Sequence, residues 1–235
     1  MNTVVGLPAL LPNLDAPSSS PSFDLVSSLD GLRSVLRPHL STVVWRRPRE
    51  RRLSSQVRSS LAEYAREGAG AIVVEGAPGS LSLEPIISAL PQRSRSAVRT
   101  DIESLAASFA PLTGRDHVRI ELSVVRGAGC RKLHVDYVGL RLLSTYVGAG
   151  TQWLEARDVC REHLGRADLD ADENNELILR ADGVLRETDC HDVVLFKGES
   201  FRGNGGRGAV HRSPPLAAGE QSRLLLKMDV AQCGC

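Results

Sequence analysis

Short strand-like segments follow one another through the second half of the chain, and they constrain its fold more than any other feature. Residues 117–125 alternate apolar and polar side chains. Similar segments follow at residues 133–137, 142–147, 192–197, 209–213 and 224–228. Glycine and proline clusters separate them, as at 148–150 and 203–206. This pattern predicts a β-sandwich or jelly roll, interrupted by an insertion over residues 155–182.

The first half of the chain has mainly helical periodicity. Leucines recur at helical spacing over residues 24–36, behind a possible Asp24 cap, and residues 80–90 and 98–110 show similar patterns. Short strands are expected at 42–45 and 71–74. We therefore predict an α+β protein in which a mainly helical region packs on a jelly-roll core.

The predicted organisation has four parts. Residues 1–22 are rich in proline and serine and predict a flexible arm. The helical region covers 23–115, the jelly-roll core covers 116–230, and residues 231–235 form a cysteine-containing tail.

Composition excludes several classes of function. The 29 basic residues nearly balance the 28 acidic ones, and aromatic residues make up only 4%, so we expect no nucleic-acid partner. The chain has no apolar run long enough to cross a bilayer, and we expect no membrane partner. Its five cysteines form no disulfide framework, which favours a reduced, cytoplasmic setting.

Four residues in these strand contexts point to metal chemistry. Residues i and i+2 of a strand share a face, so His134 and Asp136 can present an imidazole and a carboxylate together. His211, from a distant strand, completes a ligand set of two histidines and one carboxylate, which is typical of non-haem Fe(II) oxygenases. Arg223, after a Pro-Pro turn, can place a guanidinium in the same pocket to pair with a carboxylate.

Simpler interpretations stay open at this point. The two histidines can be core-edge residues satisfied by backbone groups, and Asp136 can end a strand or pair with Arg141 or Arg212. A jelly roll can also bind metal without oxidising anything, or hold an empty pocket as a structural partner.

The sequence around these four residues resembles a known family. Residues 141–146, followed by Gly148-Ala149-Gly150-Thr151-Gln152-Trp153, resemble the strand and G-x-G-T-x-W/F turn that follow H-x-D in prolyl-hydroxylase-like enzymes. Residues 192–198 resemble the strand that precedes their distal histidine. The chain thus resembles 2-oxoglutarate/Fe(II)-dependent dioxygenases with a double-stranded β-helix core. More narrowly, residues 130–229 resemble an uncharacterised bacterial family with an H-V-D…R-L-L-x-T-Y-x-G-x-G-T-x-W-L…H-R-S-P-P…R-L-L-L signature.

The broader resemblance implies roles for single residues. His134, Asp136 and His211 would hold Fe(II), and Arg223 would pair with the distal carboxylate of the cosubstrate 2-oxoglutarate. Tyr146 would add a hydroxyl to that carboxylate. The implied activity is hydroxylation of an unknown substrate, either a small molecule or a protein side chain.

A zinc site is the alternative. Cys233 and Cys235 supply half of a tetrahedral site, and the other donors could come from the Cys160–His163 or Cys190–His191 segments. The alternative function is therefore that of a non-catalytic, zinc-handling jelly roll.

Overall fold

A computed structural model describes residues 20–68, 70–127, 129–215 and 222–230. The strands are β1 (Phe23–Val26), β2 (Thr42–Trp45), β3 (Gly70–Gly76), β4 (Val118–Arg126), β5 (Leu140–Val147), β6 (Gln152–Leu154), β7 (Leu185–Glu187), β8 (Val193–Lys197), β9 (Val210–Arg212) and β10 (Ser222–Val230). The α-helices are α1 (Ser55–Glu67), α2 (Glu84–Ala89), α3 (Gln92–Thr113) and α4 (Ala171–Ile178). Short 3₁₀ turns are η1 (Asp30–Leu36), η2 (Arg49–Arg51), η3 (Ala156–Asp158) and η4 (Arg161–His163).

Seven strands form the larger sheet, in the order β1-β2-β8-β5-β10-β4-β3. Strand β1 runs parallel to β2, and every other neighbouring pair is antiparallel. The central strands β5, β8 and β10 carry buried side chains on both faces, because each face of this sheet is covered.

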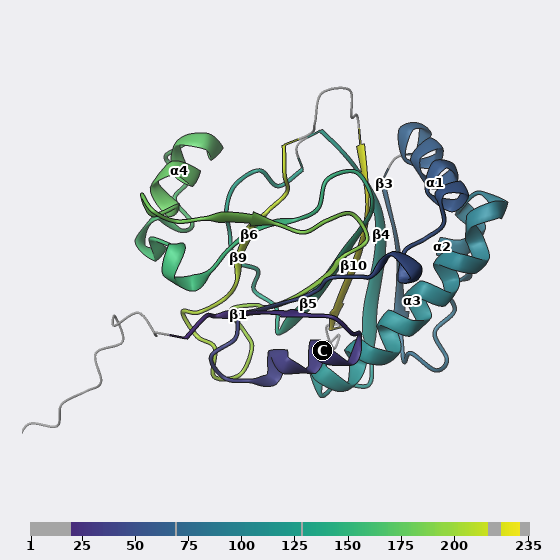
Figure 1. Ribbon diagram of the computed structural model, residues 1–235, viewed down its shortest axis with the longest axis horizontal. Helices are drawn as coiled ribbons and strands as arrows, with labels where there is room; N and C mark the ends of the chain where they lie inside the picture. Colours follow the sequence, from purple (N-terminus) through teal and green to yellow (C-terminus); the bar gives the residue numbers. More distant parts are fainter. Residues whose placement is uncertain (1–19, 69, 128, 216–221, 231–235) are drawn as a thin grey trace, which may run out of the picture.

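Helices α1, α2 and α3 cover one face of this sheet, as Figure 1 shows on the right. Helix α1 begins at the Ser54 cap, whose hydroxyl accepts a hydrogen bond from the Val57 N–H. Its buried residues recur every four positions, and α3 likewise buries an apolar stripe. The main hydrophobic core therefore lies between the helices and the sheet.

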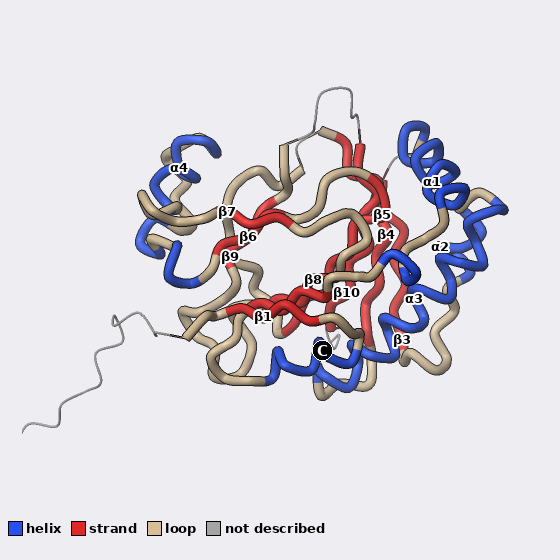
Figure 2. The backbone as a smooth tube through the Cα atoms, in the orientation of Figure 1, coloured by secondary structure: helices blue, strands red, loops and turns tan. Residues whose placement is uncertain are grey.

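A smaller sheet of three strands, in the order β7-β6-β9, faces the other side of the molecule (Figure 2). A second apolar cluster, which includes Leu143, Trp153 and Phe196, joins residues of both sheets. Helix α4 and the turns η3 and η4 make up the 155–182 insertion beside this smaller sheet.

The α+β prediction is confirmed at the level of a mixed protein with a large, mainly antiparallel sheet. Predicted strands at 42–45, 71–74, 117–125, 142–147, 192–197, 209–213 and 224–228 all correspond to observed strands. Within the part of the chain that the structure describes, the two sheets do not join into a closed barrel.

Two local predictions are wrong. Residues 24–36 do not form one helix: β1 ends at Val26, and η1 starts only at Asp30. Residues 133–137 do not form a strand, because only an isolated bridge at His134 is present there.

The predicted division at residue 116 stays a prediction. Strands β1, β2 and β3 come from the first half of the chain, yet they pair into the same sheet as strands of the second half. Most of the predicted arm (residues 1–19) and the tail at 231–235 lie outside the described residues. No helix among the described residues is long and apolar enough to span a membrane.

Candidate metal centre

His134 and His211 face each other across an isolated antiparallel bridge. The His134 N–H donates to the His211 carbonyl at 3.1 Å, and the His211 N–H donates back at 3.0 Å. Because this two-residue pair fixes both backbones, the imidazole ring centroids lie only 4.6 Å apart. Backbone pairing, rather than a continuous strand, brings the two histidines together.

Asp136 completes the group two residues later. Its Oδ1 lies 3.6 Å from Nε2 of His134, and its Oδ2 lies 3.0 Å from Nε2 of His211. One donor atom from each of the three residues lies within 4.8 Å of the others. The predicted metal ligands therefore do converge, although the strand expected to align the first two is absent.

The hydrogen bonds of both imidazoles leave Nε2 as the metal-binding nitrogen. Nδ1 of His134 lies 2.8 Å from the Lys132 carbonyl, and Nδ1 of His211 lies 3.1 Å from the Ala209 carbonyl. A carbonyl only accepts, so each Nδ1 carries the proton and donates it. In the neutral rings, both Nε2 lone pairs then face carboxylate oxygens, an arrangement that a cation between them stabilises. The donor set thus fits a divalent metal.

Burial and neighbouring charges shift the pKa values of Asp136 and His134 in opposite directions. Burial alone would raise the pKa of Asp136. In the metal-free protein, protonated imidazoles of His134 and His211 donate from Nε2 to the carboxylate, and together with the positive charge of Arg141 they hold the pKa of Asp136 well below its usual range. Burial would lower the pKa of His134, yet the Asp136 carboxylate and the Lys132 carbonyl raise it. Asp136 is accordingly an anion at neutral pH, as a metal ligand must be.

An aromatic wall supports the distal histidine. Phe196 of β8 stacks on the His211 ring, with centroids 4.6 Å apart and planes inclined by 18°. The His211 side chain is only 6% exposed, whereas that of His134 is 31% exposed. The group therefore has a closed side at β8 and β9 and an open side at His134.

Arg141 contacts the candidate metal centre, which the metal-ligand pattern did not indicate, although the sequence raised Arg141 as a possible partner of Asp136. Its Nη1 lies 2.5 Å from Asp136 Oδ2. The other possible partner, Arg212, instead donates to Gln152. Asp136 therefore pairs with Arg141 and also lies within the group of three candidate ligands.

Arg223 lies on the same face of β10 as Leu225, which packs against the apolar cluster between the sheets. Its guanidinium is buried, donating from Nε to the Ala149 carbonyl at 2.7 Å and from Nη2 to Thr145 Oγ1 at 3.1 Å. Gly148 permits this packing, because its φ is +88° and a Cβ there would lie 2.9 Å from Arg223 Cγ. The G-x-G turn thus serves to seat the arginine.

Tyr146 is not brought to this group. Its hydroxyl donates to Asp101 of α3 at 2.7 Å, and its ring belongs to the core under the helices. Thr145, by contrast, accepts a hydrogen bond from Arg223, so Tyr146 and Thr145 have their contacts on different sides of the sheet. Tyr146 was expected to add a hydroxyl to the cosubstrate carboxylate, but its hydroxyl lies on the helix-covered side of the sheet.

The proposed cysteine donors do not form a second centre among the described residues. Of those residues, the ones that converge as candidate metal ligands are His134, Asp136 and His211. Cys160 and Cys190 are outside that group, and Cys233 and Cys235 lie beyond the described part of the chain.

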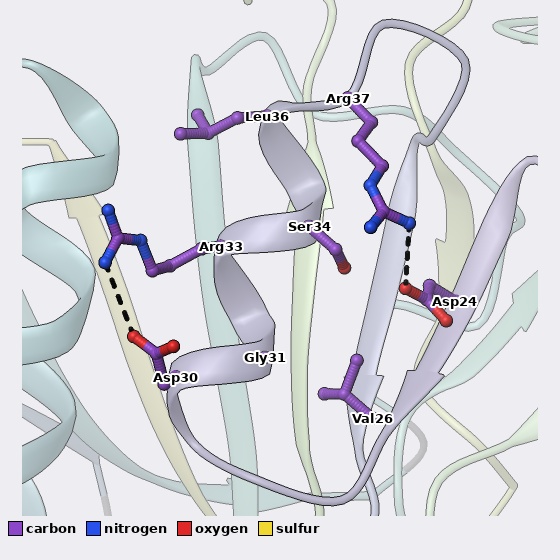
Figure 3. A pocket seen from close by; sticks show the side chains of 8 residues that line it. All are labelled: Asp24, Val26, Asp30, Gly31, Arg33, Ser34, Leu36 and Arg37. Carbon is purple, nitrogen blue, oxygen red and sulfur yellow. Dashed lines mark ion pairs between the residues drawn. The ribbon is translucent and has the colours of Figure 1, made fainter.

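A separate groove lies between η1 and β1 (Figure 3). Asp30 pairs with Arg33 at 3.5 Å and Asp24 pairs with Arg37 at 3.9 Å within it. Its charges are thus paired with each other, and none of its lining residues belongs to the candidate metal centre.

Comparison with solved structures finds similar folds at low sequence identity. A bsmA homologue from Methylobium petroleophilum is 13% identical over 86% of this chain and 92% of its own, with a TM-score of 0.50. A prolyl-4-hydroxylase from Pseudomonas putida is 14% identical over 88% and 96%, with a TM-score of 0.45. Dioxygenase for auxin oxidation 1 from Arabidopsis thaliana, in a complex with 2-oxoglutarate, is 10% identical over 88% and 91%, with a TM-score of 0.47.

At such identities the likeness concerns the fold alone. No curated protein matches the chain in sequence. A family model does match it, over residues 27–229, which include all three candidate metal ligands and Arg223. The chain therefore belongs to the family described as protein of unknown function DUF1826.

Proposed function

We propose that this protein is a non-haem Fe(II)- and 2-oxoglutarate-dependent oxygenase of the hydroxylase type. The observation that carries the proposal is the convergence of His134, Asp136 and His211, with both Nε2 atoms turned toward the carboxylate. Two histidines and one carboxylate leave coordination positions open on an octahedral ion, which is the arrangement that Fe(II) oxygenases use.

We also infer that the two sheets are the halves of a double-stranded β-helix. In support, the His134–His211 bridge continues the smaller sheet beyond β9, and the cluster around Trp153 and Phe196 fills the space between the sheets. The metal centre would then lie at one end of this interior, which is its usual place in such a fold.

Arg223 and Thr145 are the residues that we assign to the cosubstrate. A carboxylate that accepts from the Arg223 guanidinium would form a charge-assisted pair where water is excluded. The Thr145 hydroxyl, which already accepts from Arg223, is placed to donate to the same carboxylate. Because Tyr146 points away, Thr145 replaces it in this role.

Apolar side chains between the sheets keep water from the reacting groups. Leu143, Trp153 and Phe196 are each at most 6% exposed. Iron, 2-oxoglutarate and O₂ together supply the oxidation of a substrate C–H bond, with succinate and CO₂ as co-products. The protein's contribution is to hold the metal, orient the cosubstrate and exclude water.

Anaerobic titration with Fe(II) and 2-oxoglutarate tests this proposal. The wild-type protein should develop the weak visible charge-transfer band of the iron–2-oxoglutarate chelate, and 2-oxoglutarate should raise its melting temperature. Asp136→Ala should abolish both effects, while His39→Ala, which changes an exposed histidine outside the group, should leave them unchanged. A wild-type protein that binds Fe(II) but shows neither the band nor the protection would overturn the oxygenase assignment.

The second candidate is a non-catalytic metal-binding protein that uses the same three ligands. Imidazole and carboxylate donors suit zinc as well as iron. The observation that favours it is the thiol of Cys130, which lies beside the partly exposed His134.

A further inference from the structure

Cys130 lies against the open side of the candidate metal centre. Its Sγ is 3.5 Å from Nδ1 and 3.9 Å from Nε2 of His134. The thiol is free and the residue is solvent-exposed. It therefore stands on the side of the group that Phe196 leaves uncovered.

The backbone around Cys130 is held against the strand that carries the distal histidine. The Ser213 N–H donates to the Cys130 carbonyl at 2.9 Å, just beyond the end of β9. Gly129 fits there with a φ of +53°, because a Cβ would lie 2.9 Å from Ser213 Oγ. The second attachment is the His134–His211 bridge. Backbone hydrogen bonds thus hold both Cys130 and His134 against the segment 211–213.

The intervening residues bring the thiol back toward the imidazole. Four positions separate Cys130 from His134, while only two separate their partners Ser213 and His211. The two additional residues between Cys130 and His134 form a loop between the two backbone pairs. Cys130 therefore lies beside the His134 ring rather than farther along the strand direction.

The resulting donor set differs from that of an open iron site. A thiolate, two imidazoles and a carboxylate are four ligands that tetrahedral zinc accepts, with zinc–sulfur bonds of about 2.3 Å and zinc–nitrogen bonds of about 2.0 Å. Those bond lengths put tetrahedral ligand atoms about 3.5 Å apart. The 3.9 Å between Cys130 Sγ and His134 Nε2 is close to that spacing. Cys130 is outside the group whose donor atoms all lie within 4.8 Å of one another, so its Sγ has to move toward the other ligands to complete the tetrahedron.

We propose that Cys130 is a fourth protein ligand that a thiophilic divalent cation such as Zn²⁺ recruits, closing the centre formed by His134, Asp136 and His211. The proposal rests on the metal centre put forward above. On binding, the thiol proton passes to water, and the thiolate and the carboxylate together balance the charge of the cation. Four protein ligands leave no positions for a chelating cosubstrate, so zinc bound in this way would hold the protein in an inactive form.

Cobalt(II) substitution tests the ligand assignment on the full-length, reduced protein. Wild-type protein with one equivalent of Co²⁺ should show a near-ultraviolet thiolate-to-cobalt charge-transfer band. Cys130→Ser should abolish the band, and the matched variant Cys160→Ser, which changes a partly exposed free cysteine of the 155–182 insertion, should retain it. Zn²⁺ should also protect Cys130, measured by mass spectrometry, from alkylation by iodoacetamide.

Affinities for two metals separate a ligand from a structural neighbour. Cys130→Ser should weaken Zn²⁺ binding by about tenfold or more but leave the affinity for Mn²⁺, which does not select thiolates, within about twofold. An equal loss for both metals would indicate a structural role and overturn the proposal. So would a cobalt–thiolate band that survives in Cys130→Ser and disappears when Cys233 and Cys235 are changed to serine.

These readouts are independent of the oxygenase assignment. If the iron–2-oxoglutarate band is absent but the cobalt–thiolate band is present, the oxygenase proposal fails and the four-ligand site stands. If the chelate band is present and Cys130→Ser changes neither cobalt spectrum nor zinc affinity, only the fourth ligand is overturned.

Discussion

Arg141 and Asp229 form a two-bond ion pair across strands β5 and β10. Nε donates to Oδ1 at 2.8 Å and Nη2 donates to Oδ2 at 2.7 Å, and the two residues are direct partners in the strand register. The side chains are only 17% and 9% exposed. This fork leaves Nη1 directed at the Asp136 carboxylate, so Asp229 orients the arginine that in turn orients a candidate metal ligand.

We predict that Arg141→Lys lowers the affinity for Mn²⁺ by about 10–100-fold, because lysine cannot hold Asp229 and Asp136 with one planar group. Asp229→Asn should have a smaller effect in the same direction. Isothermal titration calorimetry gives the affinity, and thermal unfolding without metal separates a loss of metal binding from a loss of fold.

The matched control is the exposed pair of Arg99 and Glu84, whose nitrogen and oxygen lie 2.8 Å apart. Arg99→Lys should change the Mn²⁺ affinity by less than about twofold, since exposed ion pairs contribute little. An Arg141→Lys protein that binds Mn²⁺ as tightly as the wild type would show that Asp136 needs no such support.

The second prediction concerns Arg223 and the cosubstrate. Arg223→Lys keeps the positive charge but loses the fork, so 2-oxoglutarate should bind at least about tenfold more weakly while Mn²⁺ affinity stays unchanged. Thr145→Val, which removes only the hydroxyl beside Arg223, should weaken 2-oxoglutarate binding less. Calorimetric titration of the Mn²⁺-loaded protein measures both. If the wild type, Arg223→Lys and Thr145→Val bind 2-oxoglutarate with equal affinity, the cosubstrate does not bind at Arg223.

The three candidate metal ligands can be predicted from sequence because the prediction depends only on residue type and order. His134, Asp136 and His211 converge in the structure even though the strand expected to align the first two is absent. What replaces it is a single pair of backbone hydrogen bonds between residues far apart in the chain. Local alternation cannot reveal such a pair, because its partner is set by the tertiary fold.

The wrong helix prediction at residues 24–36 has a similar cause. Leucine spacing over residues 24–36 imitates a helix, yet residues 23–26 form hydrogen bonds in register with residues 42–45, which no local pattern records. No local pattern shows on which face of β5 Tyr146 lies. The pairing of β5 with β10 shifts register between Leu224 and Leu225, opposite Thr145 and Val147, so facing relationships change there.

The third prediction is that Tyr146, unlike Arg223, does not contribute to 2-oxoglutarate binding. Tyr146→Phe should leave 2-oxoglutarate affinity within about twofold, because the hydroxyl lies on the other face of β5. It should lower the free energy of unfolding by about 1–2 kcal/mol, since Asp101 loses a hydrogen bond in a part-buried place. Urea unfolding followed by circular dichroism measures the second effect. A large loss of cosubstrate affinity with unchanged stability would restore the role implied by the family resemblance.

The last prediction concerns acid stability and His191. This side chain is buried, neither ring nitrogen has a hydrogen-bond partner, and its backbone φ is +72°. Burial and the nearby charges of Arg47, Arg58 and Arg52 lower its pKa from 6.5 to about 4. Between those two pH values, the unfolded chain binds a proton that the folded protein does not. The free energy of unfolding should therefore decrease as the pH falls from 6.5 toward 4.

At about 1.4 kcal/mol per pKa unit, a shift from 6.5 to about 4 makes His191 account for roughly 3 kcal/mol of this loss. His191→Asn removes the titrating group and suits the positive φ, because asparagine adopts it more readily than most residues. Its free energy of unfolding should vary less with pH over this window, while His39→Asn, at an exposed position, should follow the wild type. Urea unfolding at several pH values provides the comparison. Parallel curves for His191→Asn and the wild type would mean that other groups cause the acid sensitivity.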